Sequence, residues 1–308
     1  ANTTFFGSGG ADNTDAGRGA SPSLPFLTFD YAHENTLNTQ TVAANSGTYE
    51  TATFFEAPAT NFGRSLNSWQ PRTAIFKAIS GATTRVIRIG TTYTQPNYGG
   101  DQLVFSNMKI DADGISTRCI DVATGAGSGG ELNYFVARFE NIEFIDPVDH
   151  GIKIFHTSPD ITIDGCDFSY EAKKAIIASN GTNLSATGDA AVTITNNTID
   201  CTTPSSSDGT LVAACDAYAG LERGDFDYVF SSNTVTVDVD ASISTDYTVL
   251  KLERAETITV ENNSITATTT TFANDFIGMS PASDASTNII DNALLKNNDL
   301  DTDAASGI

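Results

Sequence analysis

The stretch VTITNNTID (192–200) alternates apolar and polar residues and is interrupted by two asparagines. A similar stretch, ITVENNSIT, occupies residues 258–266, and ALLKNNDLD occupies residues 293–301. Strict alternation over a few residues is typical of a short β-strand with one buried face. Each stretch therefore predicts two short strands joined by an asparagine-containing turn. Its recurrence at long intervals indicates a repeating architecture.

The repeat is carried by pairs of apolar residues, one before each turn and one five positions later. The pairs are Phe105/Ile110, Phe139/Phe144, Ile163/Phe168, Ile194/Ile199, Phe230/Val235, Val260/Ile265 and Leu295/Leu300. Successive first members lie 24 to 36 residues apart, as calculated from their positions. Self-similarity at such a period is the signature of a solenoid, in which each repeat packs on its neighbours.

Each repeat also carries a third short apolar strand, and helical periodicity is missing. The third strands are CIDV (119–122), GIKI (151–154), AIIA (175–178), TLVA (210–213), VLKL (249–252) and FIGM (276–279). Three strands per coil predict an all-β chain that forms a single-stranded right-handed parallel β-helix.

Asparagines recur three residues after the first apolar member in the later repeats, at Asn197, Asn233, Asn263 and Asn298. A sharp turn between strands favours a residue that tolerates a left-handed backbone, as Asn does. Stacked from coil to coil, buried Asn amides can also hydrogen-bond to one another. We therefore predict an Asn ladder. The equivalent positions of earlier coils hold Met108, Ile142 and Cys166, which predict apolar packing.

This pattern resembles the pectate-lyase-like superfamily of right-handed parallel β-helices, including its asparagine ladder. The resemblance covers about residues 100–308 and extends weakly to TVAANSGTYE (41–50) and to residues 72–90. The resemblance implies the fold but no single function, because the superfamily includes polysaccharide lyases, glycoside hydrolases, phage tailspikes, adhesins and structural proteins. In its enzymes, substrate lies along the groove beside the third strands.

The chain ends suggest a cap and an assembly. Residues 1–40 are rich in Gly, Ala, Ser and Asn, and we interpret them as an N-terminal arm and cap, with residues 41–308 forming the β-helix domain. Residues 301–308 begin a coil without completing it, and NTTFF (2–6) is a good short strand. We therefore expect self-association through the chain ends by strand addition.

Charge and composition exclude several classes of partner. The chain has 16 Lys and Arg against 38 Asp and Glu, a formal charge of −22, so we expect no nucleic acid partner. No apolar run is long enough to cross a bilayer, so no membrane insertion is expected. The chain opens on Ala1 without a signal pattern, as a processed secreted chain or a trimmed one would. We expect an extracellular, cell-surface or virion-surface location.

Candidate catalytic residues follow from alternation along the third strands. The outward positions are Asp121, Lys153, Ile177, Lys251 and Gly278, with Arg118 and His150 at the strand entrances. A lyase needs a base for the proton alpha to a uronate carboxylate and a cation that neutralises the carboxylate. Lys153 and Arg118 could fill these roles, with His150 as a further candidate. The alternative is an ordinary cross-strand Asp–Lys pair, and the signatures of the hydrolases are absent.

Oxygen-rich turns are candidates for calcium. Asp111, Asp113, Asp121 and Asp146 are the candidate ligands, and they lie in or near turns. Asx-turns between strands are the alternative interpretation of DADG (111–114) and DVDAS (238–242).

The four cysteines contain no close pair of the kind that zinc or redox motifs require. Cys201 and Cys215 flank a segment that begins as a polar loop, so they are candidates for a disulfide. Cys119 and Cys166 have no partner assigned from the sequence.

Three classes of function fit these observations. A non-catalytic extracellular structural protein, such as a filament, fibre or adhesin subunit, is our first expectation, because no dense charged cluster is evident and the chain ends favour assembly. A polysaccharide lyase or hydrolase acting on acidic glycans is the second. The third is a tailspike-like glycan-binding protein.

Overall fold

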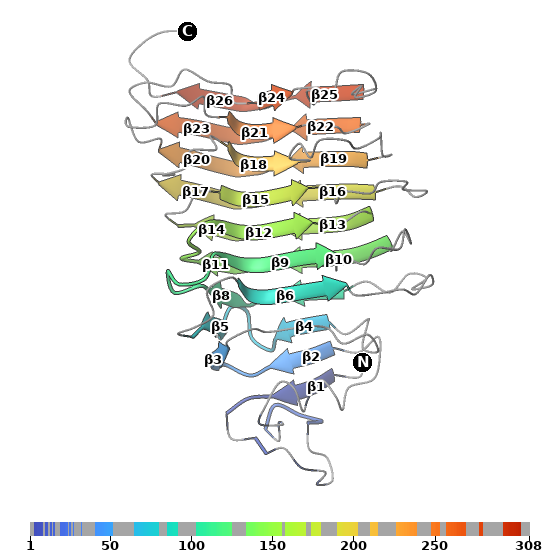
Figure 1. Cartoon of the computed structure of the whole chain (residues 1–308), viewed down its shortest axis with the longest axis vertical. Coiled ribbons are helices and arrows are strands. Elements are labelled where there is room, and N and C mark those ends of the chain that lie inside the picture. The colour runs from blue at the N-terminus through green and yellow to red at the C-terminus, as the bar shows by residue number, and fades with distance from the viewer. Residues whose placement is uncertain are drawn as a thin grey trace.

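The computed structural model contains three parallel β-sheets wound into a parallel β-helix (Figure 1). Successive coils pass from one sheet to the next and rise from the N-terminal to the C-terminal end with a right-handed turn. The structure describes residues 3–8, 10–11, 13, 15, 19–23, 25, 27, 32, 41–51, 65–79, 85–91, 103–124, 134–155, 158–170, 174–179, 190–202, 210–214, 226–238, 248–252, 257–268, 277–279 and 292–302. Within these ranges, no helix has the length and apolarity needed to cross a membrane.

Sheet A contains the strands that precede the asparagine turns. In spatial order they are β1 (Thr3–Phe6), β2 (Thr41–Ala44), β4 (Ser65–Ser68), β7 (Leu103–Ser106), β10 (Tyr134–Glu140), β13 (Ser158–Asp164), β16 (Ala190–Thr195), β19 (Phe226–Ser231), β22 (Thr257–Glu261) and β25 (Asn292–Lys296). Neighbouring strands pair in parallel and in register, as in the alignment of Ile194 with Ile163 and Phe230.

Sheet B contains the strands that follow these turns. They are β3 (Gly47–Thr51), β5 (Ala74–Ala78), β8 (Lys109–Asp111), β11 (Glu143–Ile145), β14 (Asp167–Ser169), β17 (Thr198–Thr202), β20 (Thr234–Asp238), β23 (Ser264–Thr268) and β26 (Asp299–Thr302). The second member of each apolar pair lies in this sheet, so the five-residue spacing joins sheet A to sheet B through a two-residue turn.

Sheet C contains the third strands, as the sequence predicts. They are β6 (Arg85–Thr91), β9 (Arg118–Thr124), β12 (His150–Phe155), β15 (Lys174–Ser179), β18 (Thr210–Ala214), β21 (Thr248–Leu252) and β24 (Ile277–Met279). The predicted three strands per coil are therefore confirmed.

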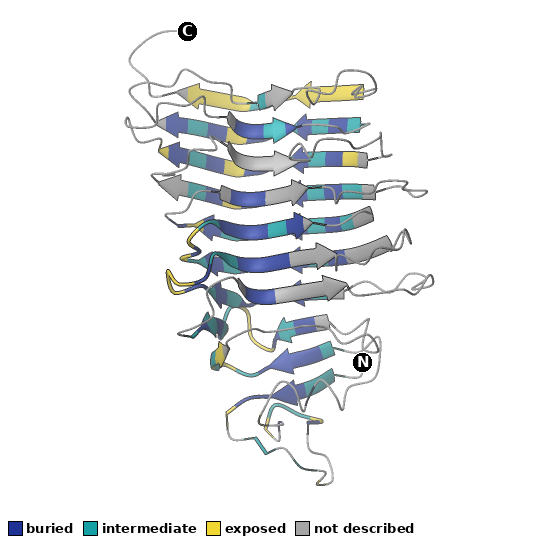
Figure 2. Cartoon of the chain, in the orientation of Figure 1, coloured by how far each residue is buried: buried dark blue, intermediate teal, exposed yellow. Residues whose placement is uncertain are grey.

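The core runs along the axis of the solenoid, between the three sheets (Figure 2). Six of the seven predicted apolar pairs are at most 1% exposed. Aromatic rings stack on their counterparts one coil away, as between Phe144 and Phe168, whose centroids lie 4.5 Å apart. The seventh pair differs, because Leu295 and Leu300 in the last described coil are 50% and 44% exposed.

The Asn ladder is confirmed and is buried at Asn197, Asn233 and Asn263. Each amide nitrogen donates to the Oδ1 of the next Asn along the ladder, at 3.0, 3.1 and 2.9 Å from Asn197, Asn233 and Asn263. The same nitrogen donates to a backbone carbonyl of the preceding coil, as from Asn263 to Phe230 at 2.9 Å. Each Oδ1 also accepts the backbone N–H of the preceding ladder residue, which extends the ladder down to Cys166. These contacts satisfy polar groups that burial would otherwise leave unpaired.

The left-handed backbone of the turn lies one residue before the ladder position, which corrects our assignment of that conformation to the ladder Asn itself. Positive φ angles occur at Asn196 (57°), Asn262 (58°) and Asn297 (54°), and Ser232 takes the same role in its coil (58°). The two residues of an Asn pair therefore have separate tasks. The first Asn makes the turn because it tolerates φ > 0, and the second fills the interior.

The N-terminal end is covered by its own chain. Strand β1 pairs in parallel with β2, and Phe6 is fully buried against Tyr49. The Phe5 N–H donates to the Gly19 carbonyl at 2.8 Å, and Asn45 Nδ2 donates to the Pro22 carbonyl at 2.8 Å. Addition of residues 3–6 to a neighbouring subunit would therefore require this strand to leave sheet A.

Replacing Asn263 with Ala removes the central member of the ladder. We expect Asn263→Ala to lower the free energy of unfolding by about 1–3 kcal/mol, because it leaves buried donors and a carbonyl unpaired. The measurement is urea unfolding followed by circular dichroism. Ser264→Ala, at an exposed neighbouring position, is the control. Equal urea midpoints for the two variants would show that the ladder does not stabilise the coil.

Candidate functional site

Basic residues are concentrated in the strands of sheet C. Its seven strands contain six of the chain's 16 Lys and Arg residues and one of its 38 acidic residues. The basic residues are Arg85, Arg88, Arg118, Lys153, Lys174 and Lys251, joined by His150, and the acidic residue is Asp121. Sheet C is therefore the one sheet whose strands reverse the sign of the whole chain.

The other two sheets have the opposite balance. The strands of sheet B contain eight acidic and two basic residues, and those of sheet A contain five acidic and two basic residues. In sheet B the two lysines are already paired, because Lys77 contacts Asp113 at 2.7 Å and Lys109 contacts Glu143 at 2.7 Å. A negatively charged ligand would accordingly meet repulsion at sheets A and B and attraction at sheet C.

Strand register places the basic residues of sheet C in two adjacent columns. The first column aligns Arg85, Arg118, His150 and Lys174 on consecutive strands. The second column aligns Arg88, Asp121 and Lys153. Because neighbouring strands lie about 4.8 Å apart, basic residues follow one another along the solenoid axis at roughly that interval. In the second column Asp121 lies between the two basic residues, so opposite charges are neighbours there.

Arg118 and Asp121 form an ion pair within β9. Arg118 Nη1 donates to Asp121 Oδ2 at 3.0 Å, and the two side chains are 20% and 6% exposed. Lys153 occupies the register position next to Asp121 on β12, as the alternation predicts. The lyase interpretation assigns Arg118 the neutralisation of a substrate carboxylate, but this guanidinium already has a protein carboxylate as partner.

His150 begins β12 between Arg118 and Lys174 in the register. Its side chain is 7% exposed, and its Nδ1 lies 2.8 Å from Asp149 Oδ2. The backbone N–H of His150 donates to the Thr117 carbonyl at 3.0 Å. The structure therefore places this candidate at the buried entrance of the sheet.

Gly151 separates His150 from the outward Lys153, and packing requires glycine there. A Cβ atom at this position would collide with the Tyr170 hydroxyl and would approach the Ala175 carbonyl oxygen to 2.9 Å. The close approach of β12 to the residues after β14 therefore depends on a missing side chain.

The four calcium candidates are not gathered into one site. Lys77 lies 2.7 Å from Asp113 and 3.7 Å from Asp111, and the Asp113 carboxylate raises the pKa of Lys77. The Asp113 N–H donates to Asp111 Oδ1 at 2.8 Å, which is the Asx-turn interpretation of this loop. Asp121 instead belongs to sheet C. Among the described residues, no group of three or more His, Cys, Asp or Glu could hold a metal ion.

The two cysteines whose side chains the structure describes, Cys119 and Cys166, contribute no reactive group. Cys119 and Cys166 are buried free thiols, and burial raises the pKa of both, for Cys166 to about 12. Raised pKa values favour the inert thiol over the thiolate. The predicted pairing of Cys201 with Cys215 lies outside the described residues, since they do not include Cys215.

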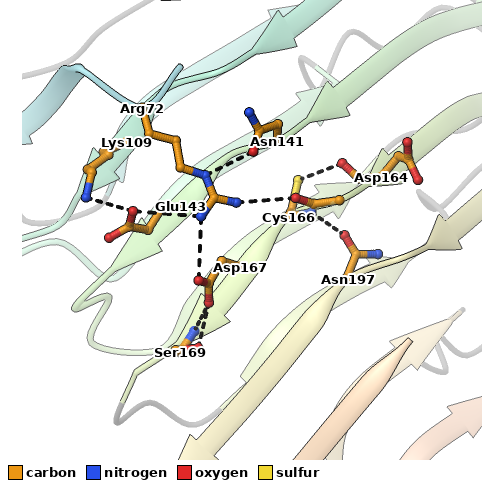
Figure 3. A network of polar contacts seen from close by, with 10 residues as sticks. Arg72, Lys109, Asn141, Glu143, Asp164, Cys166, Asp167, Ser169 and Asn197 are labelled. Atoms are coloured by element: carbon orange, nitrogen blue, oxygen red, sulfur yellow. Dashed lines mark hydrogen bonds and ion pairs between the residues drawn. The ribbon is translucent and has the colours of Figure 1, made fainter. Parts of the chain in front are cut away.

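Arg72 forms a polar network that sequence reasoning missed (Figure 3). Its backbone has φ 56°, and its Nε donates to Asn141 Oδ1 at 3.0 Å, while Nη2 donates to the Gly165 carbonyl at 3.4 Å. Nη1 lies 3.7 Å from Asp167 and 4.0 Å from Glu143. One guanidinium thus joins the turns of two consecutive coils. Its partly buried contacts fit a structural role beside sheet B, apart from the basic columns of sheet C.

No protein-family model matches this chain, and no curated protein matches its sequence. The parallel β-helix and the distribution of its side chains are therefore the basis for an assignment of function.

The Arg118–Asp121 pair can be tested by neutralising each member. We expect Arg118→Gln to lower the free energy of unfolding by about 1–3 kcal/mol, because it removes a charged partner from the buried Asp121. Adding Asp121→Asn should recover part of this loss. Urea unfolding of both single variants and the double variant measures the coupling. Strictly additive losses would show that the two side chains do not stabilise each other.

Proposed function

We propose that this chain is an extracellular β-helix protein, related in fold to the pectate-lyase-like superfamily, that binds an acidic polysaccharide through sheet C without catalysis. The observation that carries the proposal is the charge of sheet C, which holds six Lys and Arg residues and one acidic residue in a chain of net charge −22.

The arrangement of the charges favours a polymer as ligand. Each of the consecutive strands β6, β9, β12 and β15 carries at least one Lys or Arg residue. A chain of uronate sugars presents carboxylates at regular intervals, so it can meet several of these positions at once. Salt screens charges beyond about 10 Å, so a glycan bound on sheet C is attracted by the basic residues of that sheet and is little repelled by the acidic residues of sheets A and B.

A nucleic acid fits this surface less well than an acidic glycan. Duplex DNA carries dense phosphate charge and is wide enough to experience the acidic sheets on either side of sheet C. A single glycan chain is narrow and less densely charged. The pairing of Arg118 with Asp121 favours binding over lyase chemistry on the same face.

Binding to polygalacturonate at low ionic strength tests this proposal. Isothermal titration calorimetry should show binding that weakens as salt is added, and Lys153→Gln should weaken it about two- to fivefold, the range of an exposed ion pair. Lys296→Gln in sheet A removes the same charge from an exposed position and is the matched control. Dextran should not bind.

Several outcomes would contradict the proposal. They are equal losses in the two lysine variants, equal affinity for dextran, or tighter binding to single-stranded DNA than to polygalacturonate. Release of unsaturated uronates, detected by their ultraviolet absorbance, would make the face an active site and overturn its non-catalytic character.

An assembly role is the second candidate, and a specific observation favours it. Leu294, Leu295 and Leu300 in the last described coil are 49%, 50% and 44% exposed, although Leu295 and Leu300 occupy core positions (Figure 2). In the coils below, each ladder backbone N–H from Cys166 to Asn263 donates to the Asn of the following coil. We propose that a second copy of this chain packs against these leucines in a filament, fibre or adhesin.

Sedimentation velocity over a range of protein concentrations tests the assembly role. The unaltered chain should associate as its concentration rises. Leu300→Lys should prevent association, because burying a lysine in that contact is costly. Val148→Lys, at a side chain that is 48% exposed elsewhere, should have no effect. A chain that sediments as a monomer at every concentration would contradict this role.

A further inference from the structure

Trp69 is the chain's single tryptophan, and half of it is exposed. It follows β4 in the turn that leads to β5, at the N-terminal end of the solenoid and outside sheet C. Its relative exposure is 52%. Tryptophan combines a large apolar surface with a polar N–H, and such side chains are enriched at binding surfaces.

The turn holds this indole in a fixed position. The backbone N–H of Trp69 donates to the Ala44 carbonyl at 2.8 Å, and the backbone N–H of Ala74 donates to Ser68 Oγ at 3.2 Å. Thr73 Oγ1 donates to the Gln70 carbonyl at 2.9 Å. The indole also contacts the buried ring of Phe5 edge to face, with centroids 4.9 Å apart at 79°. A ligand that binds here meets a preformed surface and loses little conformational entropy in ordering it.

The surroundings of Trp69 are polar and uncharged. Residues 41–49 and 65–71 lie in the two adjacent turns and strands and contain no Asp, Glu, Lys, Arg or His, and the guanidinium of Arg72 in the same turn is held by Asn141 and Gly165 of later coils. The Ser46 hydroxyl lies 3.0 Å from Thr73 Oγ1 and 3.3 Å from Gln70 Oε1. Ser46 and Gln70 are exposed. Hydroxyl and amide groups in the same turns as an aromatic ring match a ligand that is apolar on one face and hydroxylated at its edge, and the cation of this turn, Arg72, already binds Asn141 and Gly165.

Burial of Phe5 does not by itself explain why the Trp69 indole is half exposed. Phe5 is 4% exposed, so the contact with Trp69 already completes its burial while half of the indole stays open. We propose that Trp69 stacks against the C–H face of a neutral pyranose, while Gln70 and Ser46 form hydrogen bonds with its hydroxyls. This second carbohydrate site is independent of the acidic-glycan site on sheet C.

Tryptophan fluorescence reports on this site alone, because the chain contains no other tryptophan. The unaltered protein is titrated with cellohexaose, xylohexaose and mannohexaose. At least one of these neutral sugars should shift the emission to shorter wavelength in a saturable manner, and the shift should persist at high salt. Absence of a shift with all three sugars would overturn the proposal. A blue shift produced by raising the protein concentration without sugar would assign Trp69 to self-association and would also overturn it.

Two variants separate stacking from structural cover. Trp69→Leu keeps an apolar side chain over Phe5 but removes the aromatic face, and we expect calorimetric affinity for the active sugar to fall about tenfold, the upper range of one aromatic stacking contact. Its thermal midpoint should change little. Gln70→Ala keeps the fluorophore and should weaken binding through its lost hydrogen bonds. Unchanged affinity in Trp69→Leu would refute the stacking role.

Failure here leaves the sheet C proposal standing, because the two experiments use different ligands and respond differently to salt. Lys153→Gln is the control for the fluorescence titration, and it should leave the response to neutral sugar unchanged. A parallel loss of neutral-sugar binding in Lys153→Gln would contradict the independence of the two sites.

Discussion

Parallel, in-register hydrogen bonding between consecutive coils is the constraint on which the rest of this structure depends. Because neighbouring strands lie about 4.8 Å apart and side chains alternate between faces, each residue lies over the equivalent residue of the coil below. Ile163, Ile194 and Phe230 form one interior column in this way. Any property repeated in the sequence thereby becomes a continuous line along the axis of the solenoid.

Inside the solenoid, this alignment lets polar groups be buried. Asn233 is 1% exposed, yet its amide nitrogen and oxygen are both used by neighbouring coils. The ladder satisfies these groups because each buried Asn has another Asn at the equivalent position of the next coil, whose Oδ1 accepts from its amide nitrogen. Lower in the stack, Met108 and Ile142 replace the ladder with apolar packing. The change occurs at Cys166, whose backbone N–H still donates to Asn197.

Outside the solenoid, the same alignment turns scattered charges into faces. Lys77 is paired with a carboxylate of the turn after β8 and Lys109 with one of sheet B, whereas the basic residues of sheet C outnumber its single acidic residue, Asp121. The proposed glycan surface therefore follows from which sheet a residue belongs to. Turns add a different kind of surface, because Trp69 and Arg72 lie where the chain passes between sheets and follow no repeat.

The sequence by itself determined the class of fold, the three strands per coil, the ladder and six of the seven buried pairs, because alternation and turn chemistry are local properties. It also identified Asp121 and Lys153 as neighbours. Only the tertiary structure decided that Arg85 and Arg88 join them, since the segments between third strands vary in length and hide the register. The left-handed Asn196, the long reach of Arg72 and the exposure of Leu295 likewise depend on neighbouring coils. Contacts that do not follow the repeat, such as those of Arg72, are absent from any local pattern, because only the stacking of coils brings these residues together.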